Sequence, residues 1–252
     1  KEEFFGEGKQ VTGLWARARE RFRRRLEFLQ EEPDSVRARV LDEVSHGVSL
    51  PFESEPTSPV VSTKNHPDLG LRAGHVYDAL CMQLEEGSIL PFNVSGGEKP
   101  MGVLSLRWVE KSNPDEVRLT LNGRPLNEFF PAAECTLELE THRELRSNYR
   151  KGQRFLGFDL HNGFFNQQYR PSYRKWVCFR IHDSELLPKH VRALRERFPT
   201  SWVGGFVYFS YRGLVMGLSP SCQQLSRVNV AMLKVWRRFK VAGAVWDGTT
   251  FI

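Results

Sequence analysis

The sequence lacks the residue spacings that hold transition metals or activate hydrolytic nucleophiles. Its seven histidines form neither HxH nor HExxH, no serine stands in GxSxG, and no CxxC pair or Cys/His combination is present. The pattern therefore gives no support to zinc sites or to hydrolases of these types. Cysteines so far apart in sequence are typical of reduced core residues in an intracellular compartment; they are Cys81, Cys135, Cys178 and Cys222.

Long apolar runs are also missing. No stretch reaches the length of a membrane span, and no apolar signal region precedes a cleavage site. We therefore expect a soluble protein with no membrane partner. The chain begins at Lys1 without a methionine, so two interpretations stay open: the N-terminus was left out, or it was processed, which is compatible with import into an organelle such as the mitochondrion.

What the chain does have is a substantial apolar fraction and an excess of positive charge. Its 252 residues are 40% hydrophobic, enough to bury a real core. The net charge of +6 and a pI of about 9.2 favour a polyanionic partner, and nucleic acid is the leading candidate.

Arginines dominate the beginning of the chain. Over 11–32, apolar residues recur at helical spacing and arginines cover the remaining surface, which predicts an amphipathic basic helix. Two interpretations stay open: a solvated charged face, or a surface for RNA phosphates, since crowded arginines repel one another unless an anion screens them. The candidate RNA-binding residues are Arg17, Arg21, Arg23, Arg24 and Arg25. A second helix is expected over 34–44, with Asp34 as its N-cap.

The composition predicts three regions. Residues 1–48 form the basic helical extension, 49–74 an extended linker or arm rich in Pro, Ser, Thr and Glu, and 75–252 the main domain. In this domain the patterns predict a helix within 74–89 that Gly87 stops, then a hairpin of strands 101–111 and 116–123 joined by SNPDE. A strand pair over 153–165 and 174–181, a helix over 185–198, further β sequence from 202, a helix opened by Ser219 and Pro220, and a final strand follow.

Five stretches occur in a characteristic order: EEGSI, VEKSNPDEVRLTLNGRPLN, FDLHNGFFNQQY, FSYRGLVMGLSPSCQQL and AVWDG. Together they resemble the fingers and palm of reverse transcriptases, with the closest similarity to DIRS-type retrotransposon polymerases. The resemblance spans residues 80–252. It implies an α+β right-hand polymerase fold with an antiparallel palm sheet, packed helices and no thumb in this chain.

The resemblance also implies a nucleotide-binding site. Lys111 and Arg118 match cations of the finger hairpin, Phe164 matches the aromatic steric gate of motif A, and Gly217 lies in the motif B turn. Other interpretations stay open, because Lys111 and Arg118 also suit solvated charges and Phe164 suits a core position.

Several positions depart from the family pattern or suit a structural role. Asn122 stands where the family has an aspartate, and Val215 with Met216 replaces a Pro-Phe pair. Residues 185–198 insert a helix between motifs A and B. Asn122, Arg124 and Asn127 are expected to fix the turn after the hairpin.

The catalytic carboxylates are the largest departure. Polymerases use two magnesium ions, which require several oxygen ligands close together. The resemblance places Asp159 and Asp247 as the metal-binding, catalytic carboxylates. In AVWDG either Trp246 replaces the first aspartate of motif C or Gly248 replaces the second, so one carboxylate is missing in both registers. The residues that remain are then vestigial or weakened.

Two hypotheses about function follow, and a third stays open. The first is a non-catalytic, reverse-transcriptase-like subunit that binds RNA and other proteins in a ribonucleoprotein, for example an organellar ribosome, and needs no cofactor. The second is an active RNA-directed DNA polymerase of a retroelement that uses two Mg²⁺ ions. The third is a protein-binding module built on the inserted helix 185–198. The sequence favours the first.

Overall fold

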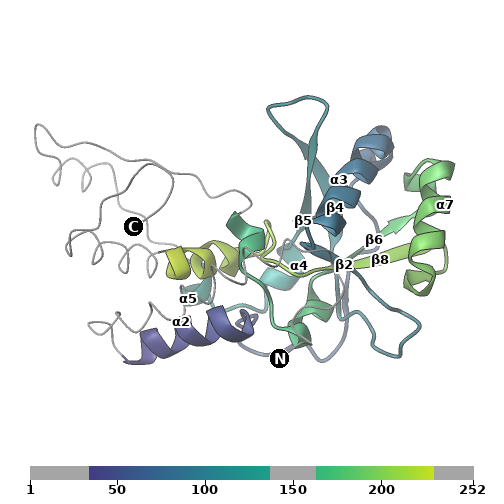
Figure 1. The fold of residues 1–252 in the computed structure, drawn as a ribbon. Coiled ribbons are helices and arrows are strands. Elements are labelled where there is room, and N and C mark those ends of the chain that lie inside the picture. The colour runs from purple at the N-terminus through teal and green to yellow at the C-terminus, as the bar shows by residue number, and fades with distance from the viewer. Residues whose placement is uncertain (1–33, 137–162, 230–252) are drawn as a thin grey trace, which may run out of the picture.

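The computed structural model describes residues 34–136 and 163–229 of the chain, which form a mixed α+β arrangement (Figure 1). Its α-helices are α2 (Asp34–His46), α3 (Ala73–Glu85), α4 (Arg124–Asn127), α5 (Ala132–Cys135) and α7 (Pro188–Arg197), and residues 219–229 are also helical. Its 3₁₀ helices are η3 (Pro67–Arg72), η4 (Gly163–Asn166), η5 (Pro171–Trp176), η6 (Asp183–Glu185) and η7 (Pro199–Ser201).

The strands make two sheets. They are β1 (Val60–Val61), β2 (Ile89–Pro91), β3 (Gly102–Val103), β4 (Ser105–Glu110), β5 (Val117–Asn122), β6 (Cys178–His182), β7 (Trp202–Val203) and β8 (Phe206–Tyr211). The larger sheet is mixed and has the order β1-β3-β6-β8-β2, with β7 added beside β8, while β4 and β5 form a separate hairpin. The α+β class predicted from sequence is confirmed at this level.

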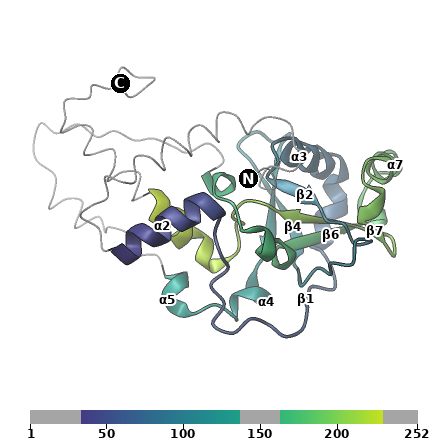
Figure 2. The ribbon, with the colours of Figure 1, turned by 60° about the horizontal axis from the view of Figure 1, so that its bottom comes forward.

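Alternation along β6 and β8 decides which face of the larger sheet is covered. Their antiparallel register pairs Phe179 with Phe209 and Ile181 with Val207, and all four side chains are fully buried. Because strand neighbours point to opposite faces, these residues share one face. That face packs against apolar residues of α3 and α7, including Leu80 and Leu194. The two helices lie side by side over the sheet (Figures 1 and 2).

The contact between α3 and α7 includes a buried histidine. The rings of Tyr77 and His190 stack with centroids 3.9 Å apart, and His190 is 9% exposed. Among the described residues, Nδ1 of His190 is buried without a hydrogen-bond partner. Burial, with a smaller contribution from the positive charge of Lys189, lowers the pKa of His190.

This histidine should make stability depend on pH. A base whose pKa is lower in the folded state takes up its proton more readily when unfolded, so stability is full above pH ~6.5 and falls as the pH drops through the folded-state pKa. We expect the urea midpoint of the wild type to decrease between pH 7.5 and pH 5.5. His190→Phe should remove part of that decrease, while an equal decrease in both proteins would contradict this role of His190.

The hairpin follows the sequence prediction. Strands β4 and β5 pair in register from Ser105 with Asn122 to Glu110 with Val117. On β5 the alternate residues Val117, Leu119 and Leu121 are buried, and β5 packs beside α3. The tip of the hairpin extends away from the larger sheet (Figure 1).

The predicted arm, residues 49–74, is built into the fold; it has no helix before Pro67, but its end is helical, in η3 and the first residues of α3. Val60 and Val61 form β1, parallel to β3, and Leu50 and Leu69 are buried. Asn65 fixes the arm further: its Nδ2 donates to the Arg180 carbonyl at 2.7 Å, and its Oδ1 accepts from the backbone N–H of Leu106 at 2.9 Å.

The predicted helices within 34–44, 74–89 and 185–198 are confirmed, with shifted ends, as α2, α3 and α7. Gly87 follows α3 with a φ of 70°, a conformation that favours glycine. A strand was predicted over 153–165, and the structure describes its last three residues. For these the prediction is wrong, since Gly163–Asn166 is 3₁₀-helical. Phe164 and Phe165 pack against the core from this turn, so tertiary packing overrides their strand propensity. The rest of that strand lies outside the described residues.

Candidate functional site

Asn127 joins the end of the hairpin to the Gly217 turn. Its Nδ2 donates to the Gly217 carbonyl at 3.2 Å, and its Oδ1 accepts from the backbone N–H of Ser219 at 3.0 Å. Ser219 opens the helix 219–229, so this carboxamide caps a helix whose first N–H groups have no intrahelical partner. Asn122 acts locally, accepting from the backbone N–H of Arg124 at 3.2 Å. The predicted role in the turn after the hairpin is confirmed for Asn122, whereas the Asn127 side chain bonds to the distant Gly217 turn instead.

Two glycines allow the hairpin and this turn to approach closely. A Cβ placed on Gly217 would lie 2.1 Å from the Leu121 carbonyl oxygen, and one on Gly123 would lie 2.1 Å from the Gly217 carbonyl oxygen. Gly217 also has a φ of 111°, which residues with a side chain rarely adopt. Both positions therefore require glycine for geometric reasons.

Phe164 lies beside the segment that leads from β8 into the same turn. Its carbonyl accepts from the backbone N–H of Leu214 at 3.1 Å, and its half-buried side chain packs against the core. Val215 is 1% exposed and belongs to the core. The structure thus brings the predicted motif A aromatic next to the predicted motif B segment.

Lys111 lies at the opposite end of the hairpin and is paired there. Its Nζ donates to Glu116 Oε2 at 2.8 Å. The hydrogen bonds from Lys111 and Asn113 lower the pKa of the Glu116 carboxyl, with Lys111 the larger cause. Glu116 therefore occupies the ammonium group that the resemblance assigns to nucleotide phosphates.

Arg118 is exposed on β5, opposite Val109. Within 34–136 and 163–229, no carboxylate forms an ion pair with it. At about 3.3 Å per strand residue, Arg118 lies roughly 16 Å along β5 from Gly123, and Lys111 still farther. The structure thus groups Phe164 with Leu214, and Gly217 with the hairpin base, but places Lys111 and Arg118 away from Gly217.

The remaining predicted site residues lie outside the described residues. These are Asp159, Trp246, Asp247 and the arginines of 17–25. Within the described ranges, no group of three or more His, Cys, Asp or Glu side chains is arranged to hold a metal ion. In the same ranges, no helix is both long enough and apolar enough to cross a membrane.

Two guanidinium groups are largely buried: Arg212, within the predicted motif B stretch, and Arg174 of η5. Arg212, at the end of β8, is 5% exposed, and its charge acts on Arg174 of η5. Burial, followed by the charge of Arg212, lowers the pKa of Arg174 to about 10. Both groups stay charged at neutral pH, so they place positive charge in the interior that sequence patterns did not indicate.

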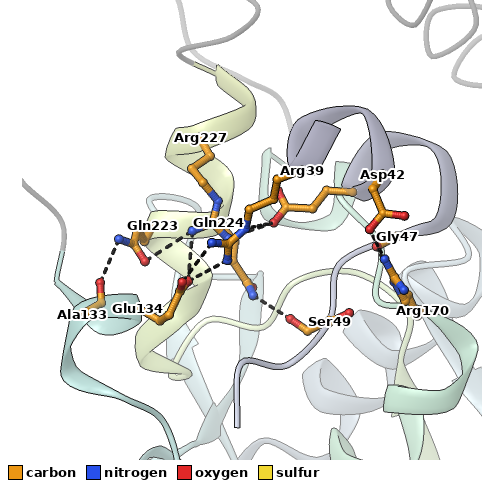
Figure 3. A network of polar contacts seen from close by, with 11 residues as sticks. Arg39, Asp42, Gly47, Ser49, Ala133, Glu134, Arg170, Gln223, Gln224 and Arg227 are labelled. Carbon is orange, nitrogen blue, oxygen red and sulfur yellow. Dashed lines mark hydrogen bonds and ion pairs between the residues drawn. The ribbon is translucent and has the colours of Figure 1, made fainter. Parts of the chain in front are cut away.

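Four charged side chains form a closed ring that joins α2, α5 and the helix 219–229 (Figure 3). Glu43 Oε1 accepts from Arg39 at 3.2 Å and from Arg227 at 2.9 Å. Glu134 accepts two hydrogen bonds from Arg39, at 3.0 and 2.9 Å, and one from Arg227 at 3.1 Å. Hydrogen bonds from Arg39 lower the pKa of the Glu134 carboxyl, although burial opposes the shift.

Neighbouring contacts extend this ring. Gln223 donates to the Ala133 carbonyl at 3.0 Å, and Gln224 donates to the Ser49 carbonyl at 2.9 Å. Arg170 pairs with Asp42 and donates to the Gly47 carbonyl (Figure 3). Sequence reasoning missed this network. The one available signal was the spacing of Arg39 and Glu43, four residues apart on a helix.

No protein-family model matches the chain, and no curated protein matches it.

Proposed function

We propose that this protein is a non-catalytic, reverse-transcriptase-like subunit that binds RNA within a ribonucleoprotein, for example an organellar ribosome. The proposal rests on two observations. Residues 80–252 resemble polymerase fingers and palm, and AVWDG lacks one of the carboxylates that the family has there. An RNA-binding subunit can keep such a fold without keeping the metal chemistry.

One contact carries the argument against nucleotide addition. Lys111, the hairpin cation that matches the family's phosphate ligand, is held by Glu116 at 2.8 Å on the same hairpin. Phosphate binding there would have to break this pair, and the Glu116 carboxylate would repel the incoming triphosphate. Of the two matched hairpin cations, Lys111 is paired in this way, whereas Arg118 forms no ion pair within the described residues.

RNA is the preferred partner because of charge. The net charge of +6 and the arginine-rich segment 11–32 favour a polyanion, and RNA phosphates would screen the repulsion among these arginines. Binding of this kind weakens as salt is raised.

Primer extension on an RNA template tests the proposal directly. The wild type should bind RNA in a salt-sensitive manner but add no nucleotides with Mg²⁺ or Mn²⁺, and Asp159→Ala should give the same background. The proposal is overturned if the wild type extends the primer and Asp159→Ala abolishes that extension. A wild type that is folded but does not bind RNA would also overturn it.

An active RNA-directed DNA polymerase is the second candidate. The observation in its favour is the Asn127 contact, which joins the hairpin to the Gly217 turn, two elements of the family's nucleotide site. In this candidate Asp159 and Asp247 would hold Mg²⁺. Metal-dependent extension that is lost in both Asp159→Ala and Asp247→Ala is the result it requires.

A further inference from the structure

The most cationic short element among the described residues is α7, the helix inserted between the predicted motifs A and B. Its ten residues contain four exposed cations and one acidic side chain, Glu196. The cations are Lys189, Arg192, Arg195 and Arg197. Such an excess on one short helix is repulsive unless anions lie nearby.

The cations are concentrated on the outer side of the helix. His190 and Leu194 are buried and mark the side that faces the core. Lys189, Arg192 and Arg195 follow one another at intervals of three residues, which places them together on the opposite side. Figure 1 shows α7 at the edge of the molecule, so this side faces outward.

Aromatic rings orient two of the arginines. The Arg195 guanidinium lies over the Trp202 ring, 4.2 Å from its centroid, and Arg197 lies over Phe198 at 5.0 Å. Asp183 is 3.6 Å from Arg195 and compensates part of its charge. Stacked guanidiniums are already ordered before a ligand binds, so binding costs less side-chain entropy.

Lys189 and Arg192 are the uncompensated cations of this face. Across the described ranges, no carboxylate forms an ion pair with either side chain. The half-buried Trp202, under the Arg195 guanidinium, adds a flat ring. Nucleic acids present both phosphates for the cations and bases that stack on such rings, whereas an acidic peptide would use only the charge.

We propose that the outer face of α7, with Trp202 at its end, is a binding surface for single-stranded RNA. This inference rests on the proposed RNA-binding function and adds a second contact region to the arginines of 17–25. Lys189 and Arg192 contact phosphates, and the Arg195–Trp202 pair contacts the base and backbone of a neighbouring nucleotide.

The test uses the full chain and a single-stranded oligouridylate, with affinity measured over a series of salt concentrations. Each lost phosphate contact lowers the slope of log affinity against log salt by about 0.7 for single strands. Lys189→Gln/Arg192→Gln should therefore lower the slope by about 1.4 and the affinity on the order of tenfold at physiological salt. Trp202→Leu should weaken binding with a smaller change in slope.

The matched control removes the same charge elsewhere. Lys64 and Lys99 are both exposed, in the arm and in the loop before β3, and Lys64→Gln/Lys99→Gln should leave the slope unchanged. Thermal unfolding would establish that each variant is folded. If the wild type binds and Lys189→Gln/Arg192→Gln binds with equal affinity and slope, α7 is not an RNA surface and the proposed function stands. If the folded wild type binds no RNA, the proposed function fails, and this inference fails with it.

Discussion

Replacing Arg227 with methionine is expected to lower the free energy of unfolding by about 3 kcal/mol. Arg227 is the only member of the ring on the helix 219–229, and it bridges Glu43 and Glu134. Glu43 is 7% exposed, so its carboxylate cannot recover full hydration when the guanidinium is removed. Methionine keeps much of the apolar volume but leaves two carboxylates with Arg39 as their remaining partner. We place the loss at the low end for buried pairs because Arg39 is 45% exposed.

An exposed pair and a double-mutant cycle separate this effect from a general charge effect. Glu110→Gln breaks the pair with Arg72, in which Glu110 is 60% exposed, and should change stability by less than about 1 kcal/mol. In a cycle of Arg227→Met with Glu43→Gln, the double variant should be more stable than the sum of the single losses predicts. Urea unfolding measures all four proteins, and additive losses would contradict direct coupling within the ring.

Gly217→Ala is expected to lower stability by about 3 to 4 kcal/mol or to prevent folding. The new methyl group would lie 2.1 Å from the Leu121 carbonyl oxygen, so the hairpin and the turn would have to separate. The φ of 111° adds backbone strain for alanine. Separation would also break the two hydrogen bonds of Asn127, which join the end of the hairpin to the Gly217 turn and to the helix 219–229.

Gly204→Ala is the matched control. Gly204 also has a positive φ, 55°, but a Cβ there would meet no atom within 4 Å. Its alanine variant should lose only the conformational preference, about 1 kcal/mol. Denaturant midpoints of the two variants therefore compare a left-handed residue in open space with one that combines a more strained φ and a close backbone contact. Equal losses would show that Gly217 is needed for its φ alone.

Local patterns predicted much of the secondary structure. The hairpin β4–β5 was predictable because alternating β-forming residues flank the turn signal Asn-Pro-Asp, and α3 because its apolar residues recur at helical spacing before Gly87. The segment around Phe164 was mispredicted because its aromatic residues favour a strand locally, whereas the core holds them in a 3₁₀ turn.

The candidate site, too, was predicted from the sequence only in part. Sequence order pointed to the hairpin and to the Gly217 turn as related elements, and Asn127 as a structural residue of the hairpin end. Glu116 follows Lys111 by five residues, so their ion pair was a reasonable expectation. It forms only because the turn between them brings the two side chains together. Both side-chain partners of Asn127, Gly217 and Ser219, lie some ninety residues further along the chain and have no local signal.

By itself, the amino-acid sequence determined the charge and the positions of most helices and strands, because these depend on composition and on neighbours within a few residues. Only the tertiary structure decided that Arg39, Glu43, Glu134 and Arg227 close into a ring, that Gly123 and Gly217 touch, and that α7 turns its cations outward. These features depend on contacts between residues that are far apart in the sequence, and the packing of the whole core determines which of those contacts form.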